Sequence, residues 1–184
     1  MAFLRLGNRP QRRIDLHDVD RVVAALEFPD AVFRTTPWQR LPTPPTPSAA
    51  IPEPRELVET GLRQWLRCCG AAMRDGQVIG MPSHAVDEAW HGFILCTEMY
   101  AAFCATAYGR FLHHFPEGVA PKAISHGSMS EQLGRTVVAW SMVAKPAEKC
   151  VLWDLDSKVG VEHPWGIGAE RVAAIEAELA DTPV

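Results

Sequence analysis

Residues 83–116 read SHAVDEAWHGFILCTEMYAAFCATAYGRFLHHFP and hold four of the seven histidines of this 184-residue chain. Apolar side chains recur there at helical spacing and fall on most sides of the helix, which is typical of a helix buried at the centre of a domain. Ser83 is a suitable N-cap, and Gly109 is a suitable residue to end the last turn. We therefore expect one long helix over about residues 83–108, with an all-α single domain built around it.

The remaining sequence divides into regions of different character. Residues 1–34 are predicted to form an N-terminal helical segment, residues 35–54 a Pro-rich arm or linker, and residues 55–184 a helical core domain. Periodicity and capping residues predict helices at 14–28, 54–75, 129–145 and 166–180. Residues 150–162 have strand-like ends around an Asp-Ser-Lys turn, so the sequence leaves open a small hairpin or an irregular lobe there.

Composition argues against several classes of function. The hydrophobic content of 47% and the charged content of 22% are ordinary for a soluble globular protein. A net charge of -4 without a Lys- or Arg-rich stripe argues against nucleic acid as the partner. No membrane span is expected, because His91 and Glu98 would lie inside the apolar run at 89–108. Five cysteines without a CxxC pair argue against a disulfide framework and favour a reducing cytoplasm.

Asp87 and His91 form the first candidate site. Their i,i+4 spacing places a carboxylate and an imidazole one above the other on a helix, and both groups bind Zn, Fe or Mn. His84 lies within about 60° of them on the same helix, but it stands in the first turn and is a weaker candidate. The alternative for Asp87 and His91 is an ordinary ion pair near the start of a helix.

The adjacent residues His113 and His114 form the second candidate. Neighbouring side chains point in different directions, so one imidazole can bind a metal while the other supports it or faces water. If one of them joined Asp87 and His91, the set would be the two histidines and one carboxylate of the facial triad in non-haem Fe(II) sites.

The length of the predicted helix works against such a joint site. An unbroken helix places Tyr108 about 25 Å beyond His91, and the five residues from Tyr108 to His113 can return at most about 18 Å. One site therefore requires a kink, a site shared between two chains, or two separate sites. Gly92 is the only helix breaker within the span, and a break nearer Thr97 would be needed to close the distance.

Three motifs carry a resemblance to a family: D-E-A-W-H at 87–91, T-x-x-Y-x-x-F-C at 97–104 and G-R-F-L-H-H-x-P at 109–116. On these motifs the chain resembles a bacterial family of small uncharacterised proteins, which are similar to a segment of the glycine-rich domain-containing proteins of plants. The resemblance implies no activity, but it implies motif positions for Asp87, Trp90, His91, Thr97, Tyr100, Cys104, His113 and His114. Some relatives carry a second histidine where this chain has Phe93, and the glycine-rich tail is absent.

Functions of different classes fit these residues. In the first, Asp87 and His91 bind a divalent metal, Zn or Fe, with His113 or His114 completing the set, Cys104 as a further candidate ligand and an enzymatic role open. In the second, the protein is a non-enzymatic interaction module whose motif is structural and whose partner is another protein or a second copy of the chain. A third, acid–base catalysis by Asp87 and His91 without a metal, lacks a visible nucleophile or phosphate loop.

Overall fold

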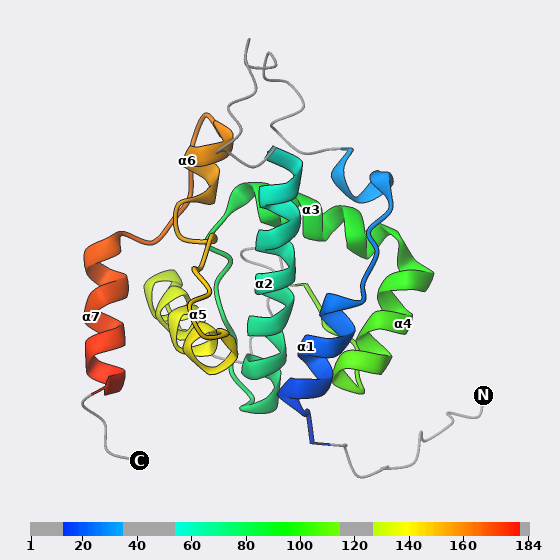
Figure 1. The fold of residues 1–184 in the computed structure, drawn as a ribbon, viewed down its shortest axis with the longest axis horizontal. Helices are drawn as coiled ribbons and strands as arrows, with labels where there is room; N and C mark the ends of the chain where they lie inside the picture. Colours follow the sequence, from blue (N-terminus) through cyan, green and yellow to red (C-terminus); the bar gives the residue numbers. More distant parts are fainter. Residues whose placement is uncertain (1–12, 35–53, 115–126, 181–184) are drawn as a thin grey trace, which may run out of the picture.

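A computed structural model describes residues 13–34, 54–114 and 127–180, and these residues form helices and loops without a strand (Figure 1). The predicted all-α class is confirmed. The elements are α1 (Leu16–Ala24), the 3-10 helix η1 (Asp30–Phe33), α2 (Pro54–Arg74), α3 (His84–Leu95), α4 (Thr97–Tyr108), α5 (Met129–Val143), α6 (Leu155–Val159) and α7 (Ala169–Ala180). The predicted Pro-rich arm lies outside the described residues, except for Pro54 at the start of α2.

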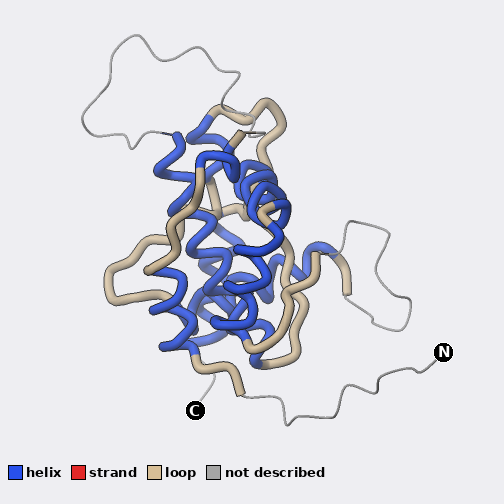
Figure 2. Tube along the Cα trace, turned by 90° about the vertical axis from the view of Figure 1, so that its right-hand side faces the viewer, coloured by secondary structure: helices blue, strands red, loops and turns tan. Residues whose placement is uncertain are grey.

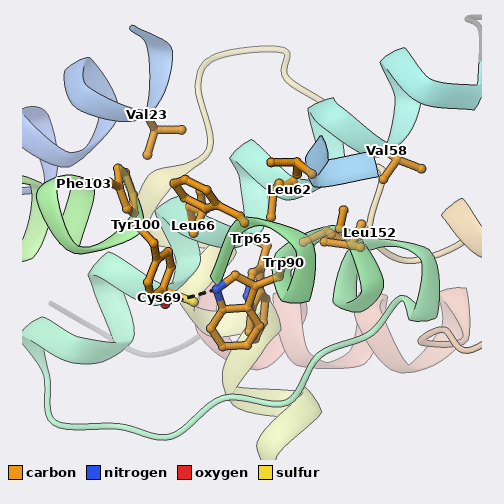
Figure 3. Packing of buried hydrophobic residues seen from close by; sticks show 14 of the residues in the cluster. Val23, Val58, Leu62, Trp65, Leu66, Cys69, Trp90, Tyr100, Phe103 and Leu152 are labelled. Carbon is orange, nitrogen blue, oxygen red and sulfur yellow. Dashed lines mark hydrogen bonds between the residues drawn. The ribbon is translucent and has the colours of Figure 1, made fainter. Parts of the chain in front are cut away.

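Helix α2 has the central position in the domain. Pro54 suits its first turn, where a missing N–H leaves no helical hydrogen bond unmade. The helix contacts α1, α3, α5 and α6. Figure 1 shows it running through the middle of the described part, with α1 and α4 to one side and α5 and α7 to the other, and Figure 2 shows the same helices and loops in a view turned by 90°. Its buried side chains join those of α1, α3 and α4 in the largest apolar cluster, which includes Val58, Leu62, Trp65 and Leu66 (Figure 3).

The expected single helix over 83–108 is wrong, because Cys96 divides the segment into α3 and α4. The backbone of Cys96 has φ -78° and ψ 60°, outside the helical region. Its N–H donates to the Phe93 carbonyl, three residues earlier, at 3.1 Å, so α3 ends in a 3-10 type turn. Its carbonyl accepts from Tyr100 N–H at 2.9 Å, which is the first helical hydrogen bond of α4. Neither proline nor glycine stands at this position, and the apolar pattern is helical on both sides of it, so the sequence carries no signal that a helix ends here.

The other predicted helices form with bounds shifted by a few residues. Helices α1 and α7 are shorter than expected, and α5 begins after Ser128. The Ser128 hydroxyl accepts from Glu131 N–H and the Glu131 carboxylate accepts from Ser128 N–H, which is a capping box. The hairpin alternative for 150–162 is wrong: the segment is irregular and contains only the short helix α6. None of the described helices combines the length and apolar character needed to cross a bilayer.

The carboxylate of Asp156 in α6 holds the start of α3. The residue is fully buried. Its oxygens accept from the Ser83 hydroxyl at 2.7 Å and from the N–H groups of His84, Ala85 and Trp165 at 2.8, 3.1 and 2.8 Å. The first N–H groups of a helix have no partner within the helix, and a negative charge is stabilised there by the helix dipole. One buried charge thus joins α3 to the irregular lobe.

On its other side α3 lies directly against η1. A Cβ added to Gly92 would overlap the carbonyl group of Val32, which is itself fully buried. Only glycine permits this approach of helix and backbone. Gly92 was expected to be a site where the helix could kink, and it instead lies inside α3 as a packing residue.

We predict that Asp156→Asn destabilises the protein by about 3 kcal/mol, because an amide lacks the charge and one of the two acceptor oxygens that four donors share. Urea unfolding followed by circular dichroism measures the change. Asp154→Asn is the matched control: Asp154 is exposed and pairs with Lys158 on the surface, so we expect at most about 1 kcal/mol there. Equal stability of the two variants would contradict the role of Asp156.

We predict that Gly92→Ala costs about 3 kcal/mol or more, because the added methyl group must displace the Val32 backbone. Gly134→Ala in α5 is the control. A Cβ at Gly134 would lie 3.7 Å from the Ile175 side chain, so the substitution should stabilise the helix by about 0.5–1 kcal/mol. Thermal melts of both variants measure the difference, and a neutral Gly92→Ala would show that α3 and η1 separate without cost.

Candidate metal centre

Three side chains of types that can bind a metal meet beside α3: Asp87, His91 and His114, called the trio below. One donor atom of each lies within 4.8 Å of those of the other two. His91 Nε2 lies 3.2 Å from His114 Nε2, and His114 Nε2 lies 3.6 Å from Asp87 Oδ1. His91 Nδ1 lies 3.7 Å from Asp87 Oδ2. Side chains of α3 and a histidine beyond Gly109 therefore lie together, an arrangement that the sequence left open.

The break at Cys96 makes this geometry reachable. With α4 turned away from α3, the chain no longer has to cover the full length of a continuous helix before it returns. Gly109 ends α4 in the left-handed conformation, at φ 70°. The chain then passes back over α3 to His114.

The hydroxyl of Tyr100 holds the returning segment in place. It donates to the Leu112 carbonyl at 2.7 Å and accepts from the indole N–H of Trp90 at 3.3 Å, the contact drawn as a dashed line in Figure 3. Trp90 stands on α3 and Tyr100 on α4, so a single buried group joins both helices to the segment two residues before His114. Burial raises the pKa of this phenol far above its usual range, which keeps the hydroxyl a neutral donor.

Aromatic contacts fix the ring of His114. The Trp90 indole and the His91 imidazole both meet it edge to face, with centroids at 4.9 and 4.5 Å and an interplanar angle of 71° in each case. Trp90 is almost fully buried and packs in turn on Trp65 with centroids at 5.6 Å. The imidazole of His114 thus rests on the core while its Nε2 faces the two side chains of α3.

The donor set fits a transition metal in kind, and two of the separations between its donor atoms have a suitable length. Ligand atoms about 2.0–2.2 Å from a tetrahedral zinc ion lie about 3.4 Å from one another. The separations of 3.2 and 3.6 Å at His114 Nε2 bracket that value. The side chains of Asp87, His91 and His114 are 15%, 39% and 21% exposed, so all three are partly accessible to water. Without an ion, the same atoms can pair with one another.

Other side chains expected near a site are placed elsewhere. His113 is exposed and its ring packs against Phe111 at 5.0 Å, outside the trio. His84 lies outside it too, with its Nε2 3.7 Å from Glu88 Oε1 and its ring stacked on Trp165. Cys104 is buried, and this burial raises the pKa of its thiol.

Cys68 and Cys69 lie in α2 and are buried in the core, where burial raises the pKa of both thiols well above the usual range. They and Cys104 lie outside the trio. A protonated thiol is a poor metal ligand, so the candidate site depends on nitrogen and oxygen donors.

Glu88, next to Asp87 on α3, also lies close to the trio, although the sequence alone gives no strong signal for it. Its Oε1 lies 4.0 Å from His91 Nδ1, on the opposite side of the ring from His114. The i,i+3 spacing to His91 and the i,i+4 spacing from His84 were the available signals. Both are common on helix surfaces and carry little weight without the structure.

Comparison with known proteins places the chain in a family. Residues 45–162 match the UCP032817-like family, and this range is more than half of the chain, so the protein belongs to that family. The expected membership of an uncharacterised family is confirmed at this level. The matched range contains the trio and Asp156. No curated protein and no solved structure matches the chain.

We predict that the protein loses stability as the pH rises above about 8.5, the usual pKa of cysteine in an unfolded chain, and loses more above about 10, the usual pKa of tyrosine. Burial raises the pKa values of the buried thiols and of Tyr100 and Tyr108, the two tyrosines of the chain, in the folded state. The unfolded state therefore loses thiol and phenolic protons first, and stability present below its pKa values is lost progressively above them. Phenolate absorbance and circular dichroism, recorded together, should change in one step.

The same titration in urea is the control, because unfolded tyrosines ionise at their usual pKa. Phenolate absorbance that develops near pH 10 while the helical signal stays intact would contradict the burial of these hydroxyl groups.

Proposed function

We propose that the protein binds a divalent transition metal, zinc or iron, through Asp87, His91 and His114. The observation that supports it best is the convergence of three donor atoms from two segments that are 23 residues apart at His91 and His114. Chance ion pairs on one helix face do not require such a return of the chain. The Tyr100 hydroxyl and the Trp90 ring hold the returning histidine against the core, as a preformed site requires.

Three protein ligands with partial exposure favour a site that also binds a small molecule at the metal. Structural zinc sites commonly have four protein ligands, whereas catalytic sites use three and leave a position for water or substrate. Two histidines and one carboxylate also form the ligand set of non-haem Fe(II) centres. We therefore propose an open metal centre, with an enzymatic role as its natural consequence and without a substrate assigned.

The proposed ligand set is smaller than the one expected from sequence. His113 was an equal candidate with His114, but its ring packs on Phe111, and we propose that it is not a ligand. The relation to glycine-rich domain-containing proteins also stays a proposal, supported by the motif residues. A location in a reducing cytoplasm likewise stays a proposal, and it is supported by the five cysteines, all of which are free.

A second candidate function is an interaction module that binds a protein partner or a second copy of the chain. The observation in its favour is the exposure of large apolar side chains, among them Leu95 at 78%, Trp165 at 46% and Phe111 at 45%. Exposed apolar groups of this size commonly take part in contacts between proteins. In this reading the trio is a set of surface pairings.

We predict that the purified protein binds close to one zinc or ferrous ion per chain, and that His91→Ala and His114→Ala each abolish this binding. His113→Ala is the matched control, because it removes the adjacent imidazole outside the trio, and it should bind as the unaltered protein does. Calorimetry with each metal and elemental analysis after purification without chelators measure the stoichiometry. Saturation at about a hundred times the Kd should stabilise the fold by about 2.7 kcal/mol.

Circular dichroism of each variant shows whether loss of metal binding is loss of fold. Unaltered protein that folds and binds neither ion would overturn the metal centre. Equal loss in His113→Ala and His114→Ala would contradict the proposed ligand set. A stable dimer or complex that persists in the His91→Ala and His114→Ala variants would support the interaction module.

A further inference from the structure

We propose that Glu88 is a positioning residue that holds the proton of the His91 ring on Nδ1 and so directs Nε2 to the metal. The inference rests on the proposed metal centre, but it makes a separate statement about the metal-free protein. Glu88 stands one residue after Asp87 on α3, and its Oε1 lies 4.0 Å from His91 Nδ1. It approaches the imidazole from the side opposite to His114.

The contact between the two imidazoles limits where their protons lie. His91 Nε2 and His114 Nε2 are 3.2 Å apart, which is hydrogen-bond distance. In a neutral pair, one of these nitrogen atoms carries the proton and the other accepts it. Each ring carries its single proton on either Nδ1 or Nε2, and the groups around the other nitrogen decide which.

The carboxylates settle this choice in favour of Nδ1 for His91. Asp87 Oδ2 at 3.7 Å and Glu88 Oε1 at 4.0 Å both face His91 Nδ1, and negative oxygens favour an N–H over a lone pair. His91 Nε2 is then the acceptor, and His114 Nε2–H is the donor. Asp87 Oδ1, 3.6 Å from His114 Nε2, favours the same arrangement.

A metal ion would take the place of the His114 Nε2 proton, among the donor atoms of the trio. Asp87 is then drawn toward the ion, which withdraws part of its charge from His91 Nδ1. Glu88 is outside the trio, so its negative charge stays near Nδ1–H, with Oε1 at 4.0 Å, an electrostatic contact longer than a hydrogen bond. Carboxylates in this outer position orient metal-binding histidines and increase their basicity.

Contacts beyond Glu88 support its position. His84 Nε2 lies 3.7 Å from Glu88 Oε1, so the carboxylate stands between two imidazoles of the same helix. The His84 ring stacks on Trp165 with centroids at 4.9 Å and an angle of 21°. Trp165 is in turn held by a hydrogen bond of 2.8 Å from its backbone N–H to the Asp156 carboxylate. These contacts therefore form a continuous row from Asp156, at the N-terminal end of α3, through Trp165 and His84 to Glu88 and the trio.

The test compares Glu88→Ala, which removes the acceptor and the charge, with Glu88→Gln, which removes the charge and keeps an acceptor oxygen. Glu98→Ala, on the exposed face of α4, is the control for loss of one negative charge. The first measurement is the nitrogen-15 NMR signature of the His91 ring in the metal-free protein at a pH of about 8, where imidazoles are mostly neutral. The His91→Ala variant assigns the signals.

We expect Nδ1–H to dominate in the unaltered protein, in Glu98→Ala and in Glu88→Gln, and the share of Nε2–H to rise in Glu88→Ala. Zinc affinity, measured by calorimetry, should fall about 10- to 100-fold in Glu88→Ala, the range found for outer carboxylates, and much less in Glu88→Gln. An unchanged ring signature in Glu88→Ala would overturn the positioning role even if affinity falls, because charge alone then explains the loss.

The two proposals fail separately. If the unaltered protein binds no metal, the metal centre is lost, and the ring signature still decides whether Glu88 orients His91. If zinc binds and both Glu88 variants bind it like Glu98→Ala, the metal centre stands and the role of Glu88 is wrong.

Discussion

The buried carboxylate of Asp156 is the constraint on which the position of α3 depends. A charge withdrawn from water is tolerated only where donors surround it, and here the donors are the Ser83 hydroxyl and three backbone N–H groups. Two of these N–H groups belong to the first turn of α3, and one belongs to Trp165, just after the irregular lobe at 150–162. The same charge therefore fixes where α3 begins and where the lobe lies. Asp87 and His91 follow within the next two turns, so their place depends on it too.

A second buried group controls the other half of the candidate site. The Tyr100 hydroxyl joins Trp90 of α3 to the Leu112 carbonyl, and this bond brings His114 over the helix. Its raised pKa makes it unsuited to proton transfer and well suited to a permanent structural bond. The two tyrosines and the nearby thiols thus serve the fold, and the partly exposed carboxylate and imidazoles form the candidate metal centre. This division separates a rigid support from a site that water can enter.

The trio shows which parts of a site a sequence can indicate. Asp87 and His91 are neighbours through helix geometry alone, so their i,i+4 spacing was sufficient to pair them. The choice between His113 and His114 was not decidable, because adjacent side chains in an irregular segment take directions set by the surrounding contacts. Those contacts are the rings of Trp90 and Phe111, which turn one imidazole toward α3 and the other away. The sequence carries no clear signal for the role proposed for Glu88, because that role depends on which nitrogen of the His91 ring the carboxylate lies near.

By itself, the sequence determined the all-α class, the approximate extent of most helices and the pairing of Asp87 with His91, because these follow from local periodicity, capping and spacing. Only the tertiary structure decided the break at Cys96, the packing of Gly92 against Val32 and the return of His114. Each of these involves contacts between residues distant in the chain: α3 packs on α2 and η1, α4 packs on α1, and the sequence around Cys96 carries no local signal for that change of direction. The candidate metal centre needs both: local helix spacing pairs Asp87 with His91, and contacts between distant residues bring His114 to them.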